Sequence, residues 1–464
     1  MNEIADSARH QRLAEVLREH PAVADATVTG DGGGHARIVP DPVADVLHRS
    51  AALDAAGRLG TALGWHEPAG ELRVAGLNRS ETEFLHREIF TDNAYFRHGI
   101  TLPAGAVVVD VGANIGMFTL CVARRSPGAR IIAVEPVAEL ADAVAVNAEL
   151  HQVDATVLCT ALGRAEGRAE FTFYPHNSVM SGRFADTAED LAVLKGYLLT
   201  GEHAQQGEHL DRLAADRMTA RTRQVPVTTL TAVVHEHGLA RIDLLKIDVE
   251  KAEAEVLDGI DEELWPRIDR IVLEVHDIDG RLAAVLAELA GRGFDVAHEQ
   301  DARLALTPCH TIYARRPGTE TTPTSLTAPV GGLTLRRLEE ELRDLVARRL
   351  PELPVPGRYT LTTDLATHPD GHGPAPERSA PASPRVAVLA RIWAELFGPE
   401  AVRPDADFFD LGGDSLTAVR LMATLESELG EDALTPDLIF TDSTFGALAA
   451  AVAASGDPER TART

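Results

Sequence analysis

The strongest constraint on the fold is an alternation of short apolar runs and helical stretches in the middle of the chain. The apolar runs occupy residues 107–111, 130–134, 156–159, 244–247, 271–275 and 311–314. Helical patterns separate most of these runs, and this order of elements is typical of a parallel sheet with helices on both faces. The sequence therefore predicts an α/β, Rossmann-like sheet.

A glycine-containing loop follows the first apolar run, and Glu135 ends the second run. An acidic residue in that position suits the two hydroxyls of a ribose. Glycines in the loop would let the backbone approach a ligand closely. We expect a nucleotide-type cofactor to contact the loop residues Asp110, Gly112, Asn114 and Gly116. A dinucleotide oxidoreductase is the competing interpretation, but the loop lacks the GxGxxG spacing that favours a pyrophosphate.

Two downstream segments distinguish these alternatives. Residues 225–230 read ValProValThrThrLeu, and residues 244–259 read LeuLeuLysIleAspValGluLysAlaGluAlaGluValLeuAspGly. Both resemble the FkbM family of S-adenosylmethionine-dependent methyltransferases, and the resemblance extends over about residues 84–315. It implies a class I methyltransferase domain over residues 51–316, S-adenosylmethionine as cofactor, and methyl transfer that usually goes to an oxygen.

The candidate acceptor side lies at the ends of two predicted strands. A hydroxyl is a poor nucleophile at neutral pH, so a base beside it should help. His276 ends one strand, where open α/β sheets place ligands, and we predict it as the base. Glu250 or Asp277 would orient His276, and Asp248 lies beside Glu250. A structural role for His276, and an ion pair between Lys246 and Asp248, are the alternatives.

No metal is expected at this site. Methyl transfer from a sulfonium needs none if the acceptor is aligned and deprotonated. The three cysteines, Cys121, Cys159 and Cys309, show no zinc-binding spacing.

A second signal lies in residues 407–416, AspPhePheAspLeuGlyGlyAspSerLeu, between two apolar helical patterns. Ser415 would begin a helix, whose N-terminus favours a phosphate, although an ordinary helix cap is the alternative. The segment resembles the peptidyl carrier domains of nonribosomal peptide synthetases. This implies a four-helix domain over residues 384–456, with 4'-phosphopantetheine attached to Ser415 by a phosphopantetheinyl transferase.

The flanking segments resemble the small C-terminal subdomain of an adenylation domain. We predict two parts of this subdomain, at residues 1–50 and 317–370, and a linker at residues 371–383. Where the family has its adenylation lysine, this sequence has His372, which cannot supply a permanently charged ammonium. We therefore expect no amino-acid activation by this chain, so that adenylation and condensation enzymes acting in trans would supply the tethered aminoacyl or peptidyl group.

Composition excludes other classes of function. A net charge of −27 argues against a nucleic-acid-binding surface. No apolar run approaches the roughly 18 residues of a membrane span, so the sequence predicts no membrane association and a cytoplasmic protein.

Together these features predict O-methylation of a hydroxyl on an intermediate tethered to Ser415, in nonribosomal peptide or mixed polyketide biosynthesis. Methyl transfer to nitrogen or carbon stays open. A non-catalytic carrier and docking protein also stays open, although the intact residues from Asp110 to Gly116 count against it.

The carrier assignment predicts that Ser415 gains one phosphopantetheine on incubation with coenzyme A and a broad-specificity transferase. Intact-protein mass spectrometry should show the added mass in the wild type and not in Ser415→Ala. A Ser415→Ala variant that still gained the mass would refute the assignment.

Overall fold

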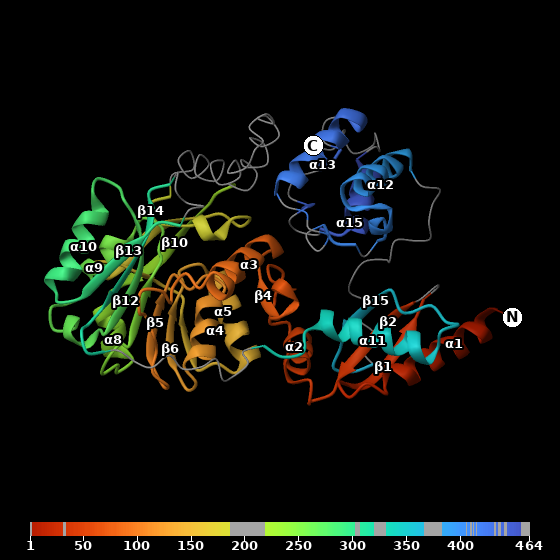
Figure 1. Cartoon of the computed structure of the whole chain (residues 1–464), viewed down its shortest axis with the longest axis horizontal. Helices are drawn as coiled ribbons and strands as arrows, with labels where there is room; N and C mark the ends of the chain where they lie inside the picture. Colours follow the sequence, from red (N-terminus) through yellow and green to blue (C-terminus); the bar gives the residue numbers. More distant parts are fainter. Residues whose placement is uncertain are drawn as a thin grey trace.

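A computed structural model describes residues 2–30, 34–185, 219–301, 307–319, 331–365 and 383–455. The last range has short gaps at 405, 409–410, 412, 414, 431–432, 435–437 and 440–442. Nearly all of the predicted linker at 371–383, and His372 within it, lie outside the described residues. Figure 1 shows the described elements coloured along the chain.

The central element is a seven-stranded sheet in the order β13-β14-β12-β11-β5-β6-β7. Its strands are β5 (Val107–Val111), β6 (Arg130–Val134), β7 (Ala155–Leu158), β11 (Leu244–Ile247), β12 (Arg270–His276), β13 (Asp295–Glu299) and β14 (Cys309–Arg315). Neighbouring strands from β7 through β12 are parallel, whereas β14 runs antiparallel to both of its neighbours. The predicted α/β, Rossmann-like class is confirmed. The apolar pattern missed β13, an edge strand without a fully buried residue.

Helices cover both faces of this sheet, as the alternation predicts (Figure 1). On one face α4 (Met117–Arg125) and α5 (Ala138–His151) share a core with β5 and β6. On the other face lie α8 (Leu230–Glu236), α9 (Glu253–Asp258) and α10 (Arg281–Gly291), with the short η4 (Trp265–Arg267).

The strand order reverses at β5, and this reversal locates the site. From β5 the chain continues outward through β6 and β7, and it returns on the other side with β11 and β12. Open α/β sheets bind ligands outside the carboxyl ends of the strands at such a point. The ends of β5, β6, β11 and β12 carry the predicted site residues.

Smaller elements border these strand ends. The strands β8 (Ala161–Leu162), β9 (Gly167–Phe173) and β10 (Arg221–Thr228) form a second sheet, and η3 (Ser178–Met180) follows β9. The hairpin of β3 (Gly64–His66) and β4 (Val74–Gly76), with η1 (Pro68–Gly70) in its turn, precedes α3 (Arg79–His86) and η2 (Arg87–Thr91).

The two flanking segments come together in one small unit. The strands β1 (Val23–Thr29), β2 (His35–Pro40) and β15 (Arg358–Leu361) form its sheet, with β15 parallel to β2. The helices α1 (Asn2–Leu17) and α11 (Leu335–Arg349) share the same core. The segment that carries the seven-stranded sheet is therefore inserted between two parts of one folded unit.

The helix α2 (Asp45–Ala55) runs through the predicted boundary at residue 50. Its Leu47 packs in the core of the small unit, while Leu53 packs with Leu150 of α5. Because one helix serves both cores, residue 50 is not a clean division between them.

The carrier segment contains α12 (Pro384–Phe397), α13 (Ser415–Leu429) and α15 (Phe445–Ala454), with the short η6 (Pro399–Ala401). Buried Trp393 packs edge-on against Phe408 and Phe445 in its core. Ser415 is the first residue of α13, as predicted, although its side chain lies outside the described part of the structure. Among the described helices, we find none with the length and apolar character needed to cross a membrane.

Candidate active site

A buried ammonium lies between the two strands at the reversal point. Lys246 of β11 places its Nζ 3.3 Å from Oδ1 of Asp110 on β5 and 3.4 Å from Oδ2 of Asp248. It also donates to the carbonyl oxygen of Gly112 at 2.6 Å. Burial disfavours the ammonium, but the two carboxylates outweigh it and raise the pKa of Lys246. The alternative ion pair between Lys246 and Asp248 is therefore present, and Asp110 is part of it.

Gly112 is required by the neighbouring strand. Its φ is +78°, and a Cβ there would come within 1.8 Å of the carbonyl oxygen of Asp248. Any other residue would thus force β5 and β11 apart. The reason differs from our expectation that glycine leaves space for a ligand, because the contact is with the protein's own backbone.

The donor loop is tied to Glu135. Asn114 and Val137 donate their backbone N–H groups to the two carboxylate oxygens of Glu135, each at 2.9 Å. Each oxygen keeps a second lone pair, so two further hydroxyl donors can be accepted. Burial raises the pKa of Glu135 to about 7, although these two hydrogen bonds oppose the shift.

The loop backbone suits a bound nucleoside. Gly112, Asn114 and Gly116 all have positive φ, and Gly116 caps the N-terminus of α4. A buried carboxylate with free lone pairs, beside a loop that turns sharply at the reversal point, fits the ribose and adjoining groups of S-adenosylmethionine.

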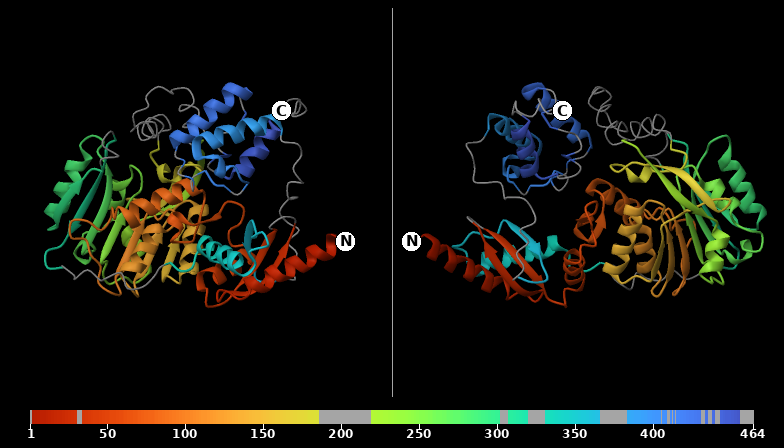
Figure 2. Two further views of the ribbon diagram at one scale, coloured as in Figure 1. Left: turned by 45° about the vertical axis from the view of Figure 1, so that its right-hand side comes forward. Right: turned by 180° about the vertical axis from the view of Figure 1, so that it is seen from behind.

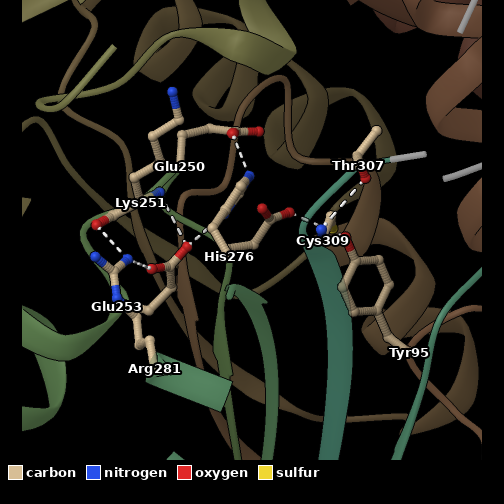
Figure 3. A network of polar contacts seen from close by, with 9 residues as sticks. Tyr95, Glu250, Lys251, Glu253, His276, Arg281, Thr307 and Cys309 are labelled. Carbon is tan, nitrogen blue, oxygen red and sulfur yellow. Dashed lines mark hydrogen bonds and ion pairs between the residues drawn. The ribbon is translucent and has the colours of Figure 1, made fainter. Parts of the chain in front are cut away.

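The acceptor side is built around His276, which is buried at the end of β12 (Figure 3). Its Nδ1 lies 2.7 Å from Oε1 of Glu253, and its Nε2 lies 3.2 Å from Oε2 of Glu250. Arg281 contacts the other oxygen of Glu253 at 2.7 Å. The imidazole is therefore held by a carboxylate on each ring nitrogen.

These two contacts determine the protonation of His276. Burial alone would lower the pKa of the imidazole, but Glu250 and Glu253 outweigh burial and raise it to about 11. At neutral pH His276 is an imidazolium, which has no free lone pair. Burial raises the pKa of Glu250 despite the opposing effect of His276. In this arrangement Glu250 is better suited than His276 to accept a proton.

Glu250 itself is held in an uncommon backbone conformation. Its φ is +45° and that of Lys251 is +70°, and non-glycine residues in this region concentrate at functional sites. The segment after η3 packs directly on it, because a Cβ at Gly182 would lie 2.9 Å from Cβ of Glu250. Within the described residues, only one Glu250 oxygen has a hydrogen-bond partner, so the other is available to an acceptor.

A third carboxylate lies beside Asp248 and Glu250. One oxygen from each of Asp248, Glu250 and Glu274 falls within a span of 4.8 Å, an arrangement that could accept a metal ion. Burial and the two neighbouring charges raise the pKa of Glu274 well above its ordinary value. The raised pKa of Glu274 lessens the repulsion within the trio, and Lys246 beside Asp248 and His276 beside Glu250 supply positive charge at its edge.

The predicted residue Asp277 does not take part in this network. It is exposed, and its Oδ1 accepts the backbone N–H of Leu282 at 3.1 Å at the start of α10. The strand β12 ends at His276, and Asp277 lies in the loop that follows it. Of the two predicted orienting residues, Glu250 contacts His276 and Asp277 does not.

Sequence reasoning missed Glu253 and Tyr95. Glu253 lies inside the family motif at 244–259, but an acid in the first turn of a helix has an ordinary explanation. Tyr95 donates to Oδ2 of Asp248 at 2.9 Å from a loop far away in sequence, and its buried ring packs on Phe118. No local signal marks either contact.

The fold and this site define a methyltransferase that uses S-adenosylmethionine, joined to a phosphopantetheine carrier domain. Comparison with protein families supports both parts. Residues 110–296 match the methyltransferase FkbM domain, and residues 387–452 match the phosphopantetheine attachment site. S-adenosylmethionine and 4'-phosphopantetheine are the cofactors of these two domains.

One curated relative establishes the family. The 31-O-demethyl-FK506 methyltransferase FkbM of Streptomyces tacrolimicus is 43% identical over 244 residues, which cover 52% of this chain and 93% of that protein. The chain belongs to the FkbM methyltransferase family, as its motifs predict.

A second relative matches the whole arrangement. The AMB antimetabolite synthetase AmbE of Pseudomonas aeruginosa is 35% identical over 480 residues, which cover 96% of this chain and 22% of the synthetase. The chain thus corresponds to about a fifth of that protein's length. Among solved structures, methyltransferase FkbM from Methylobacillus flagellatus is 13% identical with a TM-score of 0.30, covering 47% of this chain and 46% of that one.

The donor site predicts that Glu135→Ala weakens S-adenosylmethionine binding by tenfold or more. Losing hydrogen bonds to a charged group costs about 1.5–3 kcal/mol each. The loop also loses the hydrogen bond from the Asn114 N–H to Glu135. Calorimetry should show this loss, whereas Asp142→Ala, on the exposed face of α5, should bind as the wild type does. Wild-type affinity in Glu135→Ala would refute the site.

The acceptor site predicts that His276 stays protonated from pH 6 to pH 9. NMR titration of the histidine side chains can test this, with the His276 signal identified by its loss in His276→Asn. Glu250→Gln should lower the pKa of His276 from about 11, because one of the two stabilising carboxylates is removed. Asp277→Asn should leave it unchanged. A wild-type His276 that titrates near the ordinary value of about 6.5 would contradict the structure.

Proposed function

We propose that this chain transfers a methyl group from S-adenosylmethionine to a hydroxyl on an aminoacyl or peptidyl group tethered to Ser415. The observation that carries the proposal is the Glu250–His276 pair beside the donor loop. It offers one carboxylate oxygen toward the acceptor side and a fixed positive charge behind it.

The donor side would be held by the loop and the acid beside it. Glu135 would accept the two ribose hydroxyls, and the turn from Gly112 to Gly116 would bring the backbone close to the ligand. When bound, S-adenosylmethionine supplies an electrophilic methyl group on a sulfonium. The protein's task is then to align the acceptor and remove its proton.

The geometry favours exchanging the roles that the sequence predicts for His276 and Glu250. As the methyl group arrives, the hydroxyl proton would pass to the free oxygen of Glu250. His276, fixed by Glu253, would stabilise the negative charge on Glu250 before the transfer. It would also hold the Glu250 carboxylate oriented toward the acceptor. Asp248 would lie too deep in the Lys246 ion pair to serve as the first choice of base.

Tethering explains how a weakly bound acceptor could be used. A group carried on the phosphopantetheine of Ser415 reaches the site intramolecularly, so its effective concentration is set by the length of the arm and linker. The resemblance to a synthetase supports nonribosomal peptide or mixed polyketide biosynthesis as the setting. Adenylation and condensation enzymes would then supply the tethered group.

Transfer to nitrogen is the second candidate. The carboxylates Asp248 and Glu250 would also suit a protonated amine, which must lose a proton before it accepts a methyl group. The similarity to a 31-O-demethyl-FK506 methyltransferase favours oxygen instead.

Glu250→Gln should slow methylation by about a hundredfold or more, because general bases contribute about 10²–10⁴-fold. The substrate would be the chain loaded with a seryl-phosphopantetheine on Ser415, and methylation would be followed by mass spectrometry. S-adenosylmethionine affinity and Ser415 loading should be unchanged. Asp277→Asn is the control, since it keeps the network intact, and it should stay within a few-fold of wild type.

An equal loss in both variants would contradict the assignment of Glu250. Activity lost on chelation and restored by Mg²⁺ would instead show that the trio of Asp248, Glu250 and Glu274 works as a metal site.

A further inference from the structure

The carrier domain and the methyltransferase meet at the first turn of α3. Asp407, in the segment that leads to Ser415, lies 3.0 Å from Nη1 of Arg79. Both side chains are largely buried in this contact, with 13% and 23% of their surface exposed. Figures 1 and 2 show the carrier helices over α3 in each view.

The carrier side of the contact is firmly positioned. Asp407 accepts a hydrogen bond from the hydroxyl of Ser443, and its backbone bridges to Thr444 at the start of α15. The sequence from 404 to 419 contains Asp405, Asp407, Asp410 and Asp414 and no Lys or Arg. An acidic segment of this kind complements a basic side chain on its partner.

The methyltransferase side connects to the donor loop. Asn78 caps α3 and accepts the backbone N–H of Glu81 at 2.9 Å. Glu81 accepts both the backbone N–H and the hydroxyl of Ser178, and that hydroxyl in turn accepts from Asn114 at 3.1 Å. A chain of hydrogen bonds thus runs from Asn78, the residue before Arg79, to the loop expected to hold the donor.

We propose that the first turn of α3 is the surface on which the chain's own carrier domain docks to present the group on Ser415 for methylation. Arg79 and Asp407 form its charged contact. This inference rests on the proposed function, because it assigns the docking surface of the same reaction. The docking turn also lies beside η3, because Glu81 accepts the N–H of Ser178, and Gly182, two residues beyond η3, packs on Glu250. The carrier would therefore sit at the rim that both substrates share.

Charge reversal tests the contact in the reaction. Arg79→Glu should slow methylation of the seryl-loaded chain by about tenfold or more, since like charges would then oppose docking. The double variant Arg79→Glu with Asp407→Arg should recover most of that loss. Asp407→Asn, which keeps the bond to Ser443, should give a smaller defect than Arg79→Glu. Arg87→Glu, an equal charge change at an exposed residue after α3, should have no effect.

Crosslinking tests docking without any methyl transfer. In a Cys159→Ser background, which removes the exposed native thiol, Arg79→Cys with Asp407→Cys should be joined by a short bismaleimide. Arg87→Cys with Asp407→Cys should crosslink far less. All variants should bind S-adenosylmethionine and accept phosphopantetheine as the wild type does, which excludes misfolding.

The two experiments separate the two claims. Efficient crosslinking, with no methylation in the wild type or in any variant, would support the docking surface and overturn the proposed function. Normal methylation in Arg79→Glu, or no preference for the Arg79 position in crosslinking, would overturn the docking surface.

Discussion

The site depends on one buried cation. Lys246 lies between Asp110 and Asp248 and donates to the carbonyl oxygen of Gly112, so it joins the parallel neighbours β5 and β11 near their carboxyl ends. Removing one partner from a buried ion pair typically costs about 3–5 kcal/mol, because it leaves an uncompensated charge. This ammonium therefore fixes the start of the donor loop and the position of Asp248 together.

The two halves of the site extend in opposite directions from Lys246 and its two carboxylates. On the donor side, the loop after Gly112 is tied to Glu135 by the backbone of Asn114. On the acceptor side, the residues after Asp248 turn through the left-handed conformation of Glu250 and Lys251 and enter α9 at Glu253. That turn places a carboxylate on each nitrogen of His276. The same short segment thus both shapes the backbone and sets the charge of the imidazole.

The sequence predicts the fold well, and it also picks out loop residues that the structure brings together with Glu135, because these signals are local. Alternating runs identify the sheet, and Gly112, Gly116 and Glu135 lie at strand ends that any parallel sheet would bring together. The acceptor site is predicted only in part. His276 and Glu250 meet because neighbouring parallel strands end at the same edge, but their roles depend on burial and on Glu253, which a sequence pattern does not reveal. Asp277 shows the opposite error, since adjacency in sequence suggested a contact with His276, whereas Asp277 is exposed and accepts the N–H of Leu282.

The central claim is that the methyl group goes to an oxygen of the group carried on Ser415. The direct measurement is mass spectrometry of the pantetheine fragment released from the seryl-loaded chain after incubation with S-adenosylmethionine that carries an isotope-labelled methyl group. The account predicts one labelled methyl on the side-chain oxygen of the released acyl group. A label on its nitrogen or carbon, or no label on the arm while the donor is consumed, would contradict it.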